Sequence, residues 1–284
     1  MNNFKTFLLM LFLMLLLLAV GAAFRLSGPA MVMLFVLGLG INFGMYWFSD
    51  SMVLASYGAQ PLSESQAPEL HEIVRRLSGK AGLPMPRIYL VDSDQPNAFA
   101  TGRDPGHAVV AVTRGILQML DRNELEGVLS HELSHVRNRD MLTATIAAGV
   151  ASAISWLPFM AGGFFGGGRD DREGGSPVSG LLLMLLAPLV AMLVQMMVSR
   201  SREYEADRSG GVLTGHPLWL AGALRKISRG VERAPLEGAK PATAHLMIAN
   251  PFSGRGLAGL FSTHPPMEER VAALERLDQE LREG

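Results

Sequence analysis

Four long apolar runs constrain the fold of this 284-residue chain more than any other feature. Each holds 18 to 25 residues, and about 20 apolar residues in a helix are enough to cross the hydrocarbon core of a bilayer. The runs are Phe7 to Phe24, Met31 to Phe48, Met141 to Phe165 and Gly180 to Val198. The first two predict membrane-spanning helices. The last two contain Pro158 and Pro188, so the alternative there is a buried or partly inserted helix.

The alternative for the first run is the apolar core of a secretory signal peptide. Its apolar stretch is longer than the roughly 7–15 residues of a signal-peptide core, and Lys5 is the only basic residue before it. A retained membrane anchor is therefore the favoured interpretation.

Composition limits the partners and the types of metal ligand that are expected for this chain. The formal net charge is -1, which gives no indication of a nucleic-acid partner. The chain has no cysteine, so disulfides and thiolate metal sites are excluded. Any metal site must use histidine, aspartate or glutamate.

One motif has the spacing of a metal site. The sequence His131-Glu132-Leu133-Ser134-His135 places two histidines four positions apart, on one face of a helix. Two neutral imidazoles with an adjacent carboxylate can bind a metal ion and activate a water on it. We therefore predict His131 and His135 as metal ligands and Glu132 as the catalytic base. The alternative is a core helix that carries two histidines by chance.

The sequence around the motif favours a helix. Asp121 followed by Glu124 is typical of a helix start in which the two side chains cap the first turn. Apolar residues then recur at helical spacing through the motif, at Leu125, Val128, Leu129, Leu133 and Val136.

The polar segments flank the second pair of apolar runs. We predict a membrane hairpin over residues 1–49, a soluble domain formed by residues 50–140 and 199–284, and a second hairpin over 141–198. Both flanks of the second hairpin face one compartment whether it spans twice or not at all. The flanks are rich in arginine, at Arg137, Arg139, Arg200, Arg202 and Arg208. The positive-inside rule therefore predicts a cytoplasmic domain.

A metal site of this type needs a third protein ligand. Glu203, Glu205 and Asp207 stand where the second hairpin returns to the domain. Glu203 and Asp207 share a helix face, and Glu205 points elsewhere. One of the pair can bind the metal while the other orients a ligating imidazole. The alternative is a solvated helix end with mixed charges.

With several motifs in the same order along the sequence, the chain resembles the HtpX family of membrane-bound zinc metalloproteases. This family is related to the CAAX prenyl proteases. The motifs are HELSH, the apolar pair, Ser201-Arg202-Glu203-Tyr204-Glu205-Ala206-Asp207, and Ser262-Thr263-His264-Pro265-Pro266. The first apolar pair and Pro96 to Gly102 fit the family too.

The resemblance implies one Zn²⁺ per chain, with Glu203 as its third ligand and Asp207 holding a ligating imidazole. It implies that His264 supports the oxyanion or the substrate. It also implies a multi-pass protein of the bacterial inner membrane, with misfolded or damaged membrane proteins as substrates. The expected fold is a mainly α membrane protein with about four hydrophobic helices and an α+β gluzincin-like protease domain with a small β-sheet.

Three strands are expected over residues 87–92, 97–101 and 108–113, and helices over about 68–78, 217–228 and 265–281. An exposed edge of that sheet could hold an extended peptide by main-chain hydrogen bonds, with Asn97 as a substrate contact. Two other functions remain open: an intramembrane metalloprotease, and a zinc-binding scaffold without catalysis. The charged residues beside the HELSH motif argue against an intramembrane metalloprotease. Glu132 argues against a scaffold, because a purely structural zinc site would not need it.

Overall fold

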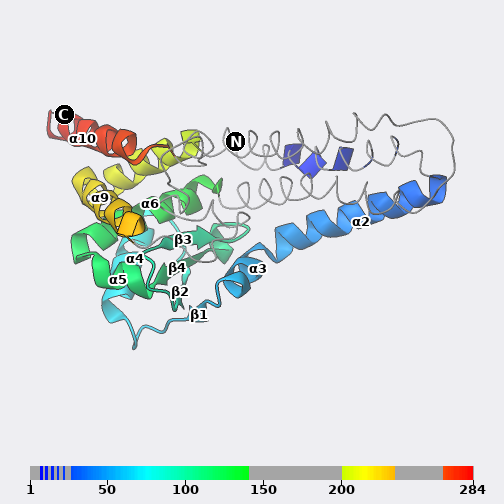
Figure 1. Cartoon of the computed structure of the whole chain (residues 1–284), viewed down its shortest axis with the longest axis horizontal. Helices are drawn as coiled ribbons and strands as arrows, with labels where there is room; N and C mark the ends of the chain where they lie inside the picture. The colour runs from blue at the N-terminus through cyan, green and yellow to red at the C-terminus, as the bar shows by residue number, and fades with distance from the viewer. Residues whose placement is uncertain are drawn as a thin grey trace.

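The computed structural model describes residues 27–140, 200–233 and 265–283, together with isolated positions between 7 and 22. Three of the four predicted membrane runs lie almost wholly outside these ranges, as do His264 and the connection that holds residues 166–179. The described residues form an α+β domain with one long helix projecting from it (Figure 1).

A small mixed sheet forms one layer of the domain. Its strand order is β1-β2-β4-β3, with β1 at Gln60–Pro61, β2 at Arg87–Val91, β3 at Ala98–Thr101 and β4 at Val109–Thr113. The strands β2 and β4 are parallel, whereas β1 and β3 pair antiparallel to their neighbours. The three predicted strands are found, and the two-residue β1 was not predicted.

Side chains alternate between the two faces of the sheet, as strand geometry requires. Val110 and Val112 of β4 face the main core, which also contains residues of α4 (Pro68–Ala81), α6 (Arg122–Asn138) and α9 (Pro217–Arg233). Val109 and Ala111 face the short helix α3 (Ser49–Ser56) on the opposite side. The sheet is therefore covered on both faces.

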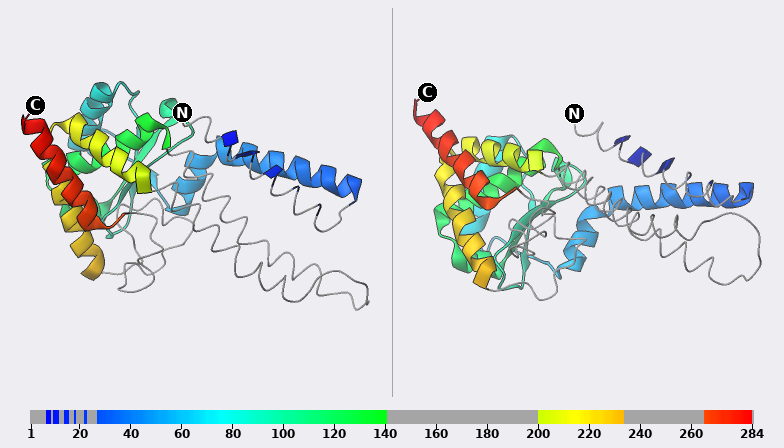
Figure 2. Two further views of the ribbon diagram at one scale, coloured as in Figure 1. Left: turned by 90° about the horizontal axis from the view of Figure 1, so that it is seen from above. Right: turned by 45° about the horizontal axis from the view of Figure 1, so that its top comes forward.

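Helices gather at the end of the domain away from the projecting helix. Figure 2 shows α9, α10 (Met267–Glu283) and the helix over residues 200–214 together at that end. The predicted helices over 68–78, 217–228 and 265–281 correspond to α4, α9 and α10, with α10 beginning two residues later. Helix α5 (Arg114–Met119) follows β4 directly and was not predicted.

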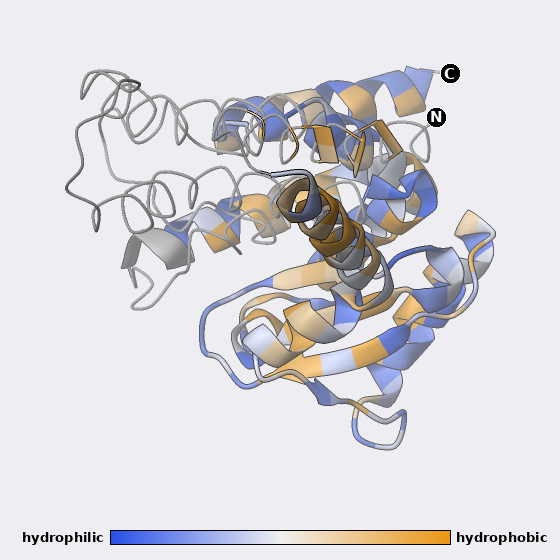
Figure 3. Ribbon diagram, turned by 90° about the vertical axis from the view of Figure 1, so that its right-hand side faces the viewer, coloured by the Kyte–Doolittle hydropathy of each residue, from blue (hydrophilic) through white to orange (hydrophobic). Residues whose placement is uncertain are grey.

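The projecting helix α2 spans Gly28–Trp47 and covers most of the second apolar run. Its surface is hydrophobic (Figure 3), and many of its large apolar side chains are exposed. These include Val32, Met33, Phe35, Val36, Leu37, Leu39, Ile41 and Phe43. Across the part of the chain that the structure describes, no helix reaches the length and apolarity required to cross a membrane.

Two contacts attach the junction of α2 and α3 to the sheet region, one from each helix. The guanidinium of Arg103, in the β3–β4 connection, lies 4.8 Å from the ring centroid of Trp47, within the range of a cation–π contact. Arg87 of β2 pairs with Asp50 of α3 at 2.6 Å. The break between α2 and α3 at Phe48 is thus fixed from both sides.

The predicted cap at the start of α6 is present. The Asp121 side chain accepts a hydrogen bond from the Glu124 amide at 3.0 Å, and the Glu124 carboxylate accepts one from the Asp121 amide at 3.0 Å. These two bonds satisfy amides that would otherwise lack partners in the first turn. They fix where the helix that carries the HELSH motif begins.

This cap makes stability depend on pH. The Glu124 amide, more than any other group, holds the pKa of Asp121 below its usual value. The cap therefore contributes fully above the unfolded-state pKa of about 3.9 and is lost as pH falls through the lower folded-state value. We expect Asp121→Ala to reduce the free energy of unfolding by about 1 kcal/mol at pH 7, with a smaller difference from the wild type below about pH 4. Urea unfolding in detergent, followed by circular dichroism at pH 7 and at pH 3, measures the free energy of unfolding of each protein.

Asp121→Asn is the matched control, because asparagine caps helices about as well but does not ionise. Its difference from the wild type at pH 7 should be small. Equal losses for Asp121→Ala at pH 7 and pH 3 would contradict the assignment.

Candidate metal centre

Helix α6 brings the two motif histidines together at one point. The Nε2 atoms of His131 and His135 lie 3.2 Å apart, and the two rings meet nearly at right angles. His131 is buried and His135 is mostly buried. The four-residue spacing therefore aims both nitrogens at the same small volume, as the sequence predicts.

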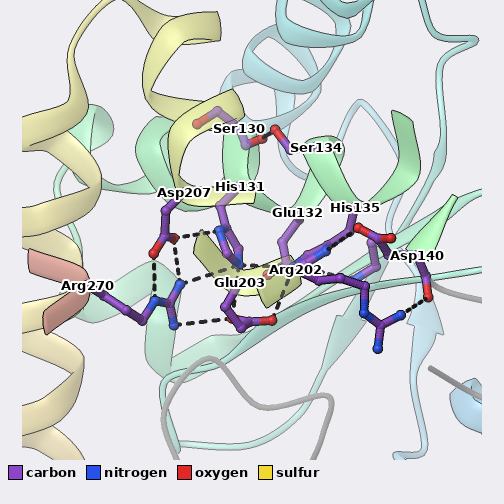
Figure 4. A network of polar contacts seen from close by, with 11 residues as sticks. Ser130, His131, Glu132, Ser134, His135, Asp140, Arg202, Glu203, Asp207 and Arg270 are labelled. Atoms are coloured by element: carbon purple, nitrogen blue, oxygen red, sulfur yellow. Dashed lines mark hydrogen bonds and ion pairs between the residues drawn. The ribbon is translucent and has the colours of Figure 1, made fainter. Parts of the chain in front are cut away.

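The helix over residues 200–214 supplies a carboxylate to the same volume (Figure 4). Oε1 of Glu203 lies 3.5 Å from Nε2 of His135, and Oε2 lies 3.7 Å from Nε2 of His131. One ligand atom from each of the three residues falls within 4.8 Å of the others. Residues separated by 68 positions in sequence thus share a single site.

The spacing of these atoms fits a tetrahedral metal ion. Zinc binds histidine nitrogen at about 2.0–2.1 Å, which places two tetrahedral nitrogen ligands about 3.3 Å apart. The two Nε2 atoms are 3.2 Å apart. Two imidazoles and one carboxylate also leave a fourth position for water or substrate, as catalytic sites require.

The two other acidic residues of this helix lie in different surroundings. Asp207 is buried one turn beyond Glu203, and its Oδ1 lies 2.9 Å from Nδ1 of His131. A carboxylate at Nδ1 favours the imidazole form that offers Nε2 to a metal. Glu205 is exposed. The structure therefore separates the three candidates as the sequence pattern indicates.

Arg270 of α10 is a member of this site that the sequence interpretation missed. Its side chain is 0% exposed. It donates two hydrogen bonds to Asp207, from Nε at 2.8 Å and from an Nη at 2.7 Å, and another Nη lies 3.4 Å from Glu203. A sequence signal existed, since Arg270 precedes Leu274 and Leu277 by four and seven positions and so lies on the apolar face of its helix.

Charges in this site shift one another's pKa values. Burial alone would raise the pKa of Asp207, but the Arg270 guanidinium outweighs it and holds the pKa below its usual value. Burial alone would lower the pKa of His135, but its hydrogen bond with Asp140 and the nearby carboxylates raise it. The carboxylates and cations of the site therefore compensate one another's charge.

Glu132 points from α6 toward the sheet. Its Oε2 accepts a hydrogen bond of 2.9 Å from the amide of Ala100 in β3. Burial raises the pKa of Glu132, although the two neighbouring histidines act in the opposite direction. A carboxylate with a raised pKa beside an open metal position is suited to accept a proton and give it back.

Close packing holds the two ligand-bearing helices in register. A Cβ atom placed on Gly210 would lie 2.9 Å from the backbone nitrogen of His131 and 3.0 Å from Oγ of Ser130. Only glycine lets the helix over 200–214 approach α6 this closely. This contact lies about two helical turns beyond Glu203 and against the backbone of the first histidine.

Two further residues, Asn97 and His264, are predicted from the sequence to support the substrate. Asn97 is buried just before β3. Its backbone amide donates to Oγ1 of Thr113, and its backbone carbonyl accepts from the Thr113 backbone amide. His264 lies outside the described residues, directly before the buried Pro265. Their roles stay predictions.

Comparisons with known proteins agree with this geometry. The family profile described as "Peptidase family M48" matches residues 64–278. A protein named "Protease HtpX homolog" from Methylibium petroleiphilum is 52% identical over 96% of this chain and 96% of its own. One from Salinibacter ruber is 50% identical over 98% of each chain. Among solved structures, S. mikatae Ste24p is similar in fold, with a TM-score of 0.54 at 20% identity. The alignment covers 92% of this chain and 61% of that one.

The choice of Glu203 as the third ligand can be tested by metal content. We expect Glu203→Ala to lose bound zinc, because two histidines alone leave the ion half coordinated. The matched control is Glu205→Ala, which removes the same charge two residues away and should keep about one zinc per chain. Atomic absorption on the purified proteins measures the content. Loss of zinc in the control alone would show that Glu205 is the ligand.

Removal of Arg270 should destabilise the protein strongly. Arg270→Met leaves the Asp207 carboxylate buried without its main cation, and breaking a buried pair in this way costs about 3–5 kcal/mol. The double variant Arg270→Met with Asp207→Asn should lose less than the sum of the two single variants. Arg282→Met, which breaks an exposed pair with Asp278, is the control and should cost at most about 1 kcal/mol. Additive losses in urea unfolding would refute the coupling.

Proposed function

Because this chain belongs to peptidase family M48 and is therefore a metallopeptidase, we propose that it is a zinc-dependent endopeptidase at the cytoplasmic surface of a bacterial inner membrane. The observation that carries the proposal is the convergence of His131, His135 and Glu203, with Glu132 beside them. Zinc is preferred because two imidazoles and one carboxylate with an open position are the donor set of zinc peptidases.

Zinc in this site would supply a Lewis acid and lower the pKa of a water toward about 7. Glu132 is the proton carrier of the mechanism. It takes a proton from the attacking water and passes it to the leaving amine, so no covalent enzyme intermediate is required. Burial raises the pKa of Glu132 above its usual value, which is the direction that favours this exchange. His264 is proposed to support the developing oxyanion, as the family resemblance implies.

The backbone of β3 is suited to hold an extended peptide. In the antiparallel β3–β4 pair, the Thr113 amide donates to the Asn97 carbonyl. Backbone groups of successive residues in a strand point in alternate directions, so those of Ala98 and Ala100 point away from β4. Within the described part of the sheet, β3 has no strand on that side. The Ala100 amide donates to Glu132 and links this edge to that carboxylate, so a peptide added here would pair with Ala98 and with the Ala100 carbonyl. We propose that substrates pair with this edge as an added strand, with little selection by side chain.

Membrane attachment is proposed from α2 and from the sequence. Exposed valine, leucine, isoleucine and phenylalanine side chains along α2 are poorly suited to water and well suited to lipid. The arginines that flank residues 141–199 favour a cytoplasmic domain. The related proteins are named as protease HtpX homologues. From the family resemblance we propose misfolded or damaged membrane proteins as the substrates.

One experiment tests the catalytic proposal. The protein is purified in detergent with zinc chelated, zinc is added, and cleavage of the protein itself and of casein is followed by gel. We expect Glu132→Gln to bind zinc normally but to lose at least 100-fold in rate, since it removes the proton carrier. Equal cleavage by the wild type and Glu132→Gln would sink the mechanism. Zinc binding without cleavage by the wild type would instead favour a catalytically inactive scaffold.

A further inference from the structure

The turn that ends α6 brings a further carboxylate to the metal site. The helix ends at Asn138, and Arg139 adopts the left-handed conformation with φ of 57°. A non-glycine residue in this region carries a steric cost of order 1 kcal/mol or more. In an uninterrupted helix residue 140 would lie about 140° around the axis from His135 and could not reach it. The strained turn is what allows Asp140 to fold back.

Asp140 reaches the nitrogen of His135 that faces away from the metal position. Its Oδ2 lies 3.3 Å from Nδ1 of His135, and the residue is only 5% exposed. A proton shared at Nδ1 leaves the lone pair of Nε2 directed toward the metal and fixes the rotation of the ring. Asp207 likewise lies at Nδ1 of His131. A separate carboxylate therefore contacts the Nδ1 atom of each ligating imidazole.

Arg202 connects this arrangement to the third ligand. Its Nη donates a hydrogen bond of 3.1 Å to the backbone carbonyl of Asp140, across 62 positions of sequence. Arg202 directly precedes Glu203 in the chain. The contact therefore joins the segment that leaves α6 to the segment that carries the carboxylate ligand, just where both approach the site (Figure 4).

We infer that Asp140 is a positioning residue for His135, and that Arg202 ties this support to the ligand Glu203. The inference deepens the proposed zinc peptidase site and rests on that function only in requiring that a metal be bound. Asp140 acts through its carboxylate on one ligand and through its carbonyl on the segment of another. Loss of the Asp140 carboxylate should therefore alter both the affinity for the metal and the geometry around it, and the contact with the Asp140 carbonyl is removed by changing Arg202.

The test measures the metal itself as well as catalysis. Full-length protein in detergent is stripped of metal and titrated with zinc against a competing chelator, and with Co²⁺ while its visible absorption is recorded. The variants are Asp140→Ala, Asp140→Asn and Arg202→Met. Glu205→Gln is the control, since it changes a nearby exposed carboxylate. Circular dichroism of the metal-free proteins shows whether each variant is folded.

Loss of a carboxylate behind a ligating histidine typically weakens metal binding 10–100-fold. We expect a loss of that size in Asp140→Ala, a smaller one in Asp140→Asn, which keeps an acceptor oxygen, and an intermediate loss in Arg202→Met. The Co²⁺ absorption should change in band position or intensity in both Asp140 variants, which a purely structural role would not cause. The control should match the wild type in both readings.

Unchanged zinc affinity or an unchanged Co²⁺ spectrum in Asp140→Ala would overturn the inference. If Asp140→Ala is not folded, Asp140→Asn is judged by the same two readings. The outcome is separate from that of the proposed function. A wild type that binds zinc but cleaves no peptide would refute the peptidase proposal, and the metal titrations would still decide the role of Asp140.

Discussion

The buried ion pair between Arg270 and Asp207 is the interaction on which this site depends. A metal centre built from histidines and carboxylates places several charged groups out of water, and each carries a desolvation cost. Arg270 offsets that cost with two hydrogen bonds to Asp207 and a contact with Glu203. Asp207 in turn holds His131. Without this cation, the acidic face of the helix over 200–214 would not be stable against α6.

The geometry of the site also depends on how closely two helices approach. The ligands come from α6 and from the helix over 200–214, so the distance between these helices sets the distance between ligands. Gly210 permits contact between the second helix and the backbone at His131. One helical turn earlier on α6, Gly127 allows the backbone of α9 near Leu220 to approach in the same way. Two glycines thus let both neighbouring helices pack closely on α6, where the Glu132 carboxylate reaches β3.

Local patterns predicted most of the secondary structure. The strands β2, β3 and β4 and the helices α4, α6, α9 and α10 follow from alternation, helical periodicity and capping residues, which are properties of neighbouring positions. The sequence did not predict α5 or the two-residue β1. Those elements are short, and packing against the sheet rather than local pattern selects them. The predicted membrane runs outside the described residues stay predictions.

The sequence by itself determined the helix that carries HELSH and predicted its two imidazoles as metal ligands, because four-residue spacing is enough to aim both rings at one point. It also placed Glu203 and Asp207 on one helix face. The tertiary structure decided which distant groups complete the site. Arg270 and Asp140 enter through the docking of α10 and a left-handed turn at Arg139. Neither depends on local spacing to the motif, since both are brought in by packing between segments far apart in the chain.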